Sequence, residues 1–225
     1  ISALTEIIED AIMSGDELHV FSSDISTAFD SLEYWSQAMG WKALGMPDDL
    51  VEMLVDMDEQ GKTAVIMGQG RTTASIDKED GWFKGRRGVR QGSVGGHIKW
   101  VVFMNFWLEY VHKEMANEGY TMSQAELGDK PTLANVFVDD SNWFTANSGA
   151  MARAVQLGEA FTSFHGLAFN KSKCEYLAVS QEQLNDGSYE RPTWVDGSPV
   201  VAKMRKKRRS EGEKEAKEAA EDAIM

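Results

Sequence analysis

The chain has 225 residues, 42% hydrophobic and 10% aromatic, which is enough to bury a substantial core and excludes disorder throughout. It contains no run of eighteen apolar residues and no charged-then-apolar leader, so we expect no membrane span and no secretory signal, and its single Cys174 fits an intracellular protein without an internal disulfide. The formal net charge of −13 argues against nucleic-acid binding, which normally needs a basic face, although basic residues cluster at 84–90 and 203–209.

The first third of the chain is predicted to alternate helices with short strands. Apolar residues at helical spacing indicate the helices, and β-branched or aromatic runs bounded by glycines indicate the strands. The predicted helices cover residues 1–14, 28–39 and 47–59, and the predicted strands cover residues 19–25, 63–67 and 82–83. Asp24 therefore comes at the end of a strand and immediately before a helix.

The remainder of the chain predicts a central helix followed by a hairpin. Residues 133–144 are apolar on both sides of Asp139 and Asp140, so we expect two strands joined by a tight turn that carries the acids. Helices are expected over residues 98–111 and 150–164, a strand over 175–179, and a second hairpin over 193–202. An acidic pair at the tip of a hairpin is exposed to solvent.

This order of elements predicts an α+β fold, an antiparallel sheet with helices packed on one face, of the split βαβ type. Residues 1–202 are expected to form this domain. Residues 203–225 change abruptly to Lys, Arg, Glu and Ala and are expected to form a charged tail. The basic run 203–209 is typical of a nuclear localisation signal, of a nucleic-acid patch or of a solvated segment.

Three segments place acids or glycines where a strand is expected to meet a loop: residues 24–30, 88–93 and 137–140. Taken singly, each segment is weak evidence for a functional site, because an Asp after a strand is usually a cap or a turn residue. Together, and in this order, they resemble motifs A, B and C of reverse transcriptases. The pattern is closest to the non-LTR retrotransposon group, with D-[IL]-x-x-A-F-D, G-V-R-Q-G-S and Y-A-D-D. Residues 166–173 are similar to the G-L-x-x-N-x-x-K of motif D, so the resemblance extends over about residues 1–180.

The resemblance implies a polymerase palm that uses two Mg²⁺ ions, or Mn²⁺, to join nucleotides. Divalent ions neutralise charge on the attacking and leaving oxygens, and Mg²⁺ prefers hard oxygen ligands. By this resemblance Asp24 and Asp139 bridge the ions, Asp140 completes the site less directly, and the Ile25 carbonyl faces a metal. Lys173 matches a lysine proposed to protonate the departing pyrophosphate, although a solvated lysine is an equal alternative.

Further positions of the resemblance concern the nucleotide and the template. Phe29 matches the residue beneath the incoming sugar, where a ring excludes a 2′-hydroxyl; packing in the core is the alternative. Gln91 and Gly92 match the segment that contacts template or base, and a plain turn at Gly92 is the other interpretation. Arg90 contacts phosphate or lies on the surface. The implied partners are deoxynucleoside triphosphates and an RNA or DNA template with its primer.

The sequence also departs from the family pattern. Phe137 replaces the tyrosine before the acidic pair, and residues 94–96 replace a proline-containing segment. The fingers are expected to be incomplete and the thumb absent, which predicts weak or no activity for this stretch alone. Three alternatives remain: a decayed or domesticated palm serving as an assembly or nucleic-acid-binding module, a viral RNA-directed RNA polymerase, and a phosphohydrolase, which leaves motif B unexplained. No oligomeric state is indicated.

Overall fold

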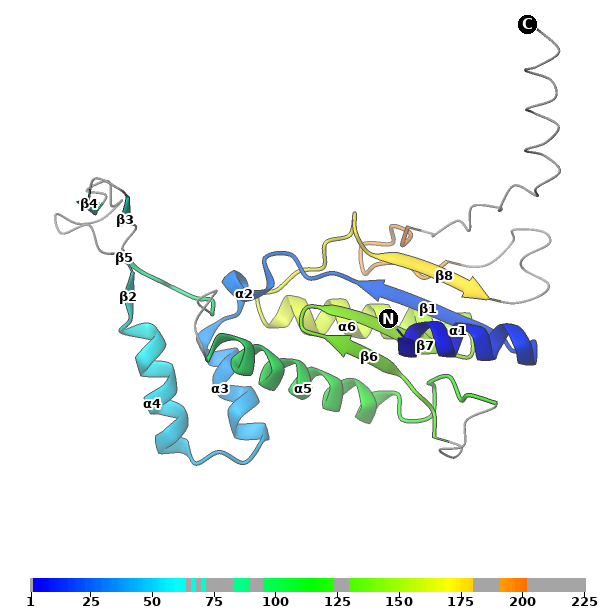
Figure 1. Cartoon of the computed structure of the whole chain (residues 1–225), viewed down its shortest axis with the longest axis horizontal. Helices are drawn as coiled ribbons and strands as arrows, with labels where there is room; N and C mark the ends of the chain where they lie inside the picture. The colour runs from blue at the N-terminus through cyan, green and yellow to red at the C-terminus, as the bar shows by residue number, and fades with distance from the viewer. Residues whose placement is uncertain are drawn as a thin grey trace, which may run out of the picture.

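A four-stranded antiparallel sheet forms the centre of the computed structural model, which describes residues 2–63, 66–67, 70–71, 83–89, 95–123, 130–179 and 191–201 (Figure 1). Its strands are β1 (Leu18–Ser23), β6 (Ala134–Phe137), β7 (Asp140–Thr145) and β8 (Glu175–Val179). The spatial order is β6-β7-β1-β8, so the first strand in the chain lies between the third and the fourth. This is the split βαβ arrangement, and it confirms the predicted α+β class.

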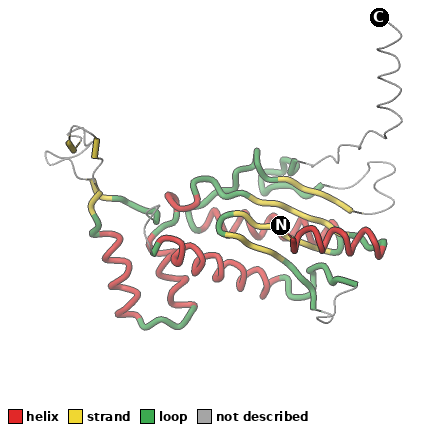
Figure 2. Tube along the Cα trace, in the orientation of Figure 1, coloured by secondary structure: helices red, strands yellow, loops and turns green. Residues whose placement is uncertain are grey.

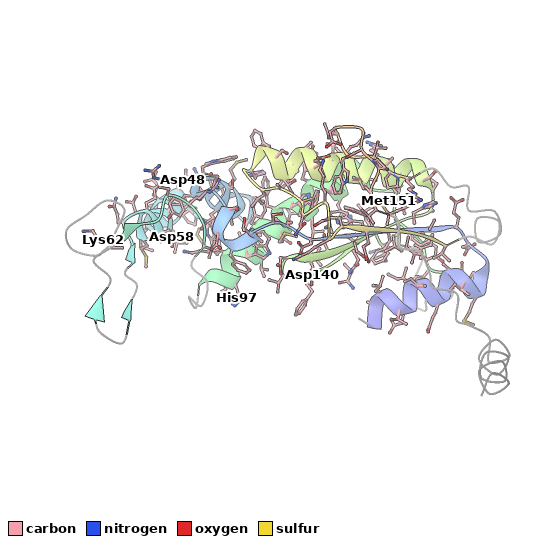
Figure 3. All side chains as sticks on the ribbon, turned by 90° about the horizontal axis from the view of Figure 1, so that it is seen from above. Asp48, Asp58, Lys62, His97, Asp140 and Met151 are labelled. Carbon is pink, nitrogen blue, oxygen red and sulfur yellow. The ribbon has the colours of Figure 1, made fainter. Side chains whose placement is uncertain are left out.

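Helices cover both faces of the sheet, which is seen edge-on in Figure 3. Phe21 belongs to the larger hydrophobic core, together with residues of α5 (Gly96–Glu114) and α6 (Ser148–Phe164). Successive side chains of a strand point to opposite faces, and Val20 and Phe144 pack instead with Ile7 and Ala11 of α1 (Ser2–Ser14). The helix α1 therefore adds a cover on the opposite face to the one that carries α5 and α6.

The predicted helix over residues 28–39 is wrong in one respect, because it is broken into α2 (Ala28–Ser31) and α3 (Tyr34–Ala43). Leu32, between them, is extended with φ −66° and ψ 114°, is fully buried, and accepts a hydrogen bond at its carbonyl from the Gly88 N–H at 2.8 Å. The break therefore lets a distant backbone segment bond where a continuous helix would use its own donors.

Beyond the sheet, α3 packs against α4 (Asp48–Glu59), and a short two-stranded ribbon follows (Figure 2). The ribbon pairs β2 (Lys62–Thr63) with β5 (Phe83–Lys84), as predicted for this region, and β3 (Ile66–Met67) pairs with β4 (Gly70–Arg71). These parts lie at one end of the molecule, away from β8.

The other predicted helices and the strand at 175–179 are confirmed. The hairpin expected over residues 193–202 is a turn closed by a single bridge between Thr193 and Pro199, without regular strands. Residues 202–225, including the predicted tail, lie outside the described residues. Within the described part of the chain, no helix combines the length and apolar character that crossing a membrane requires.

His165 at the end of α6 gives the fold a pH-dependent element. Its ring is 1% exposed, stacks on Trp35 at 5.0 Å, and lies 4.3 Å from the ring of Phe161, with Ser36 Oγ 2.9 Å from Nδ1. Burial disfavours the charged imidazolium and lowers the pKa of His165 to about 4.

The unfolded chain therefore takes up a proton at His165 at a higher pH than the folded chain does. Its contribution to stability is complete above about pH 6.5 and is lost as the pH falls towards 4. Urea unfolding of wild type between pH 7 and pH 4.5 is expected to lose about 2 kcal/mol more than unfolding of His165→Gln over the same range. Parallel pH curves for the two proteins would contradict the neutral, buried imidazole.

Candidate active site

A hollow of about 330 Å³ opens where β1 ends and β7 begins. Asp140, at the start of β7, lies at its edge, on the face of the sheet that also carries α1 (Figure 3). The residues lining the hollow are Ser22, Ser23, Asp24, Asp140, Ser141, Asn142 and Lys173. They come from three segments far apart in the sequence, so the fold, and not local sequence, creates the hollow.

Strand register brings the two carboxylates together. Ser23 pairs with Ser141 in the antiparallel ladder, so the residues one step further, Asp24 and Asp140, come opposite each other at the strand ends. The side chain of Asp24 is 21% exposed and Asp140 is exposed. Two carboxylates in one hollow create a negative site whose oxygens suit a hard divalent cation.

The floor beside the carboxylates is polar. The Ser22 hydroxyl donates to Asn142 Oδ1 at 2.7 Å, and the hydroxyls of Ser23 and Ser141 lie 2.5 Å apart. Ser22 and Asn142 lie on the same face of the sheet as the two carboxylates, and each is two residues from a side chain that α1 covers. The polar surface therefore begins where α1 no longer covers the sheet. Sequence reasoning missed these residues, although the alternation of the two predicted strands already placed them on that face.

Lys173 supplies the cation of the hollow. Its Nζ lies 3.5 Å from Asp24 Oδ2, and its side chain is 66% exposed. The backbone fixes this proximity, since the Asn170 N–H donates to the Asp24 carbonyl at 2.8 Å and the Lys173 N–H donates to the Asn170 carbonyl, also at 2.8 Å. An ion pair of this length whose lysine is largely exposed adds little to stability. Lys173 is therefore held near the carboxylate while its ammonium group can still move.

Cys174 lies beneath Asp24 and adds no charge to the hollow. It is fully buried, with Sγ 3.5 Å from the Asp24 amide nitrogen. Burial raises the pKa of the Cys174 thiol to about 11, so the thiol is neutral at physiological pH. The buried sulfur does not line the hollow, whose candidate metal ligands are oxygen atoms.

Asp139 and Ile25 are the residues next in sequence to Asp140 and Asp24. Asp139 is partly buried in the two-residue turn between β6 and β7, where Phe137 pairs with Asp140. Ile25 bridges Phe169, and since this bridge uses the Asp24 carbonyl and the Ser26 N–H, the Ile25 carbonyl takes no part in it. Nowhere in the described ranges do three His, Cys, Asp or Glu side chains gather closely enough to hold a metal ion.

The structure thus brings together Asp24, Asp140 and Lys173, while the roles of Asp139 and Ile25 as metal ligands stay predictions. Carboxylate, hydroxyl and amide oxygens line the hollow, and these are the donors that Mg²⁺ and Mn²⁺ accept. The chemistry of this donor set fits the predicted ions.

The predicted nucleotide-binding residues lie partly outside the described chain. Phe29 is in α2, partly buried, with its ring 5.4 Å from Trp100 and 5.6 Å from His97 at the start of α5. Its predicted contact with a sugar stays a prediction. Residues 90–92, the predicted contacts to template, base and phosphate, lie outside the described residues.

Comparison with known proteins gives matches to both sequence and fold. The family model described as reverse transcriptase (RNA-dependent DNA polymerase) matches residues 5–207. The chain is 26% identical over 165 residues to the Retrovirus-related Pol polyprotein from type-2 retrotransposable element R2DM of Drosophila melanogaster, covering 72% of this chain and 14% of the polyprotein.

Two solved structures resemble the fold at low sequence identity. Apo telomerase from Candida tropicalis, truncated from its C-terminal domain, has a TM-score of 0.59 at 15% identity, covering 86% of this chain and 36% of that one. Telomerase from the same organism in complex with a TWJ fragment of telomeric RNA has a TM-score of 0.58 at 13% identity, covering 93% and 33%. The chain therefore spans about a third of each telomerase and 14% of the polyprotein.

Proposed function

Because the chain belongs to the reverse transcriptase (RNA-dependent DNA polymerase) family, we propose that it extends a primer along an RNA template by adding deoxynucleotides. Membership of this family confirms the resemblance predicted from the order of the motifs, and the retrotransposon polyprotein agrees with the non-LTR group. The observation that carries the proposal is the pairing of Asp24 with Asp140 at one hollow beside Lys173.

In the proposed reaction, the 3′-hydroxyl of the primer attacks the α-phosphorus of the incoming nucleotide and pyrophosphate leaves. Two bound Mg²⁺ or Mn²⁺ ions supply charge neutralisation at the attacking and leaving oxygens. Asp24, Asp139 and Asp140 would hold these ions. Asn142 adds an amide NH2 group beside the carboxylates, where it can donate a hydrogen bond to a sugar or phosphate oxygen, while its Oδ1 accepts the Ser22 hydroxyl.

Lys173 is the proposed proton donor to the pyrophosphate. An ammonium group carries three protons and no acceptor, so it can donate a hydrogen bond to the leaving oxygen and neutralise its charge. Its exposed side chain and its 3.5 Å separation from Asp24 keep it at the hollow without a fixed geometry.

Extension of a DNA primer on an RNA template, with Mg²⁺ and deoxynucleotides, tests the proposal directly. Extension by this stretch alone is expected to be weak, whereas a longer polyprotein that contains it is expected to lengthen the primer. Asp139→Asn, which keeps the shape of the side chain and removes its charge, is expected to give only background in either protein. A folded longer polyprotein that gives no product above this background would contradict the proposal and favour the non-catalytic assembly module.

The same assay with ribonucleotides tests the substrate class. Phe29→Val is expected to raise incorporation of ribonucleotides relative to deoxynucleotides by about tenfold, because a smaller side chain leaves room for a 2′-hydroxyl. Phe106→Val is the matched control, since Phe106 is a partly buried core phenylalanine on α5. Equal discrimination by the two variants would assign Phe29 to core packing alone.

A further inference from the structure

The turn that carries Asp139 has an unusual backbone. Val138, its first residue, has φ 59°, a left-handed conformation that L residues rarely adopt and that is least suited to a β-branched side chain. Among the described residues other than glycine, only Val138 and Thr27 have positive φ. Both lie close in sequence to residues that line the hollow, Thr27 three residues from Asp24 and Val138 two residues from Asp140. Such a conformation persists only where its surroundings hold it.

One side chain from another element bonds this turn. Trp100, in the first turns of α5, donates a hydrogen bond from its indole Nε1 to the Val138 carbonyl at 2.6 Å. Trp100 is 0% exposed, and a buried indole N–H needs an acceptor. This single hydrogen bond meets two requirements. The turn needs a restraint from outside its own residues, and the buried indole N–H needs a carbonyl acceptor.

The same indole also touches the segment that follows Asp24. Its ring lies 5.4 Å from Phe29, whose backbone carbonyl in turn accepts the Val89 N–H at 2.5 Å. Trp100 therefore contacts two of the segments that supply the carboxylates, and it belongs to the helix that follows the remaining motif segment, residues 88–93. A displacement of this ring would therefore change the position of both segments.

We propose that Trp100 is a positioning residue, whose indole N–H holds Val138 in its left-handed conformation and so fixes the backbone from which Asp139 projects. The inference rests on the proposed function only for the role of Asp139, which is to hold metal ions. The bond and the turn are features of the folded chain with or without catalysis.

The chain offers a matched control on the same helix. Trp107 is also 0% exposed and lies two turns further along α5, but no atom of the described residues accepts a bond from its Nε1. Trp107→Phe removes the same atoms from the same core as Trp100→Phe without breaking a bond to the turn. The difference between the two variants therefore reports the bond, and not the loss of ring volume.

The first experiment needs no metal. In ¹⁵N NMR spectra of the whole chain, Trp100→Phe is expected to shift or split the backbone amide signals of residues 138–140, whereas Trp107→Phe leaves them in place. Val138→Gly, which accepts positive φ without strain, is expected to restore a single set of signals for the turn in the Trp100→Phe background. Unchanged turn signals in Trp100→Phe, or equal shifts in the two tryptophan variants, would overturn the proposal.

The second experiment measures Mn²⁺ affinity by electron paramagnetic resonance. Trp100→Phe is expected to weaken Mn²⁺ binding about threefold to tenfold, and less than twofold in the Val138→Gly background, while Trp107→Phe leaves it unchanged. Equal weakening in both backgrounds would overturn the proposal, because Trp100 would then act through packing. If wild type binds no Mn²⁺, the proposed metal centre fails, and the metal-free spectra still decide whether Trp100 holds the turn.

Discussion

Replacing Asp24 with Asn is expected to weaken Mn²⁺ binding by at least about tenfold and to lower primer extension by about a hundredfold or more. The amide keeps the size of the side chain but removes one of the two negative charges that register brings to the hollow. It also removes the charge that Lys173 faces at 3.5 Å. Metal binding and primer extension are both expected to weaken, because the remaining carboxylate of the hollow must then hold a divalent cation with fewer charged oxygen ligands.

Asp30→Asn is the matched control for this prediction. Asp30 lies six residues further on in the same motif segment, is exposed, and does not line the hollow. Metal affinity by paramagnetic resonance, primer extension and thermal unfolding should be measured for both variants. Asp24→Asn should keep its unfolding temperature, because the lysine of the ion pair that it loses is 66% exposed. Equal Mn²⁺ affinity for the two variants would show that Asp24 is not a metal ligand.

Local patterns were sufficient to predict the ends of the strands that carry the acids. The apolar residues on both sides of the acidic pair placed Asp139 in a turn, and the strand predicted before Asp24 placed that residue at the end of a strand. The family pattern supplied the expectation that Asp24 meets the acidic pair. The register that brings Asp24 opposite Asp140, Ser23 with Ser141, depends on pairing over more than a hundred residues, and neither strand shows it alone.

The features that sequence reasoning missed share a long-range cause. The helix is broken at Leu32 because its carbonyl bonds Gly88, fifty-six residues away, and α1 covers a second face because β1 presents apolar side chains to both. The left-handed turn at Val138 is stabilised by a tryptophan from another helix. A propensity argument sees only neighbours in the chain, so it favours a continuous helix and an unstrained turn at these positions.

The acidic composition is an average over unlike parts of the chain. Six acids lie on the single helix α4, which carries no basic residue, and Figure 3 shows Asp48 and Asp58 of this helix in a different part of the molecule from Asp140. Net charge describes solubility and long-range attraction of the whole chain. It does not describe the local field at a hollow where Lys173 stands beside two carboxylates.

Gly88→Ala is expected to lower the free energy of unfolding by about 3 kcal/mol or more. Gly88 has φ +92°, and a Cβ at this position would lie 2.7 Å from the Asp30 carbonyl oxygen and 2.9 Å from its carbon. Neither the backbone at Asp30 nor the backbone at Gly88 can move easily. The N–H groups of Gly88 and Val89 donate hydrogen bonds to the carbonyls of Leu32 and Phe29, which hold the two segments together. Glycine is therefore required here for two reasons, the left-handed backbone and the close approach of two main chains.

Gly45→Ala separates these two reasons, and urea unfolding of both variants measures the difference. Gly45 has φ +79°, yet a Cβ there would meet no atom within 4 Å, so its replacement should cost only about 1 kcal/mol, the penalty for left-handed backbone. Equal losses for the two variants would mean that the segment at Gly88 can move away from α2. An excess loss at Gly88 would show that the backbone of Gly88 and Val89 is fixed against the residues that follow Asp24.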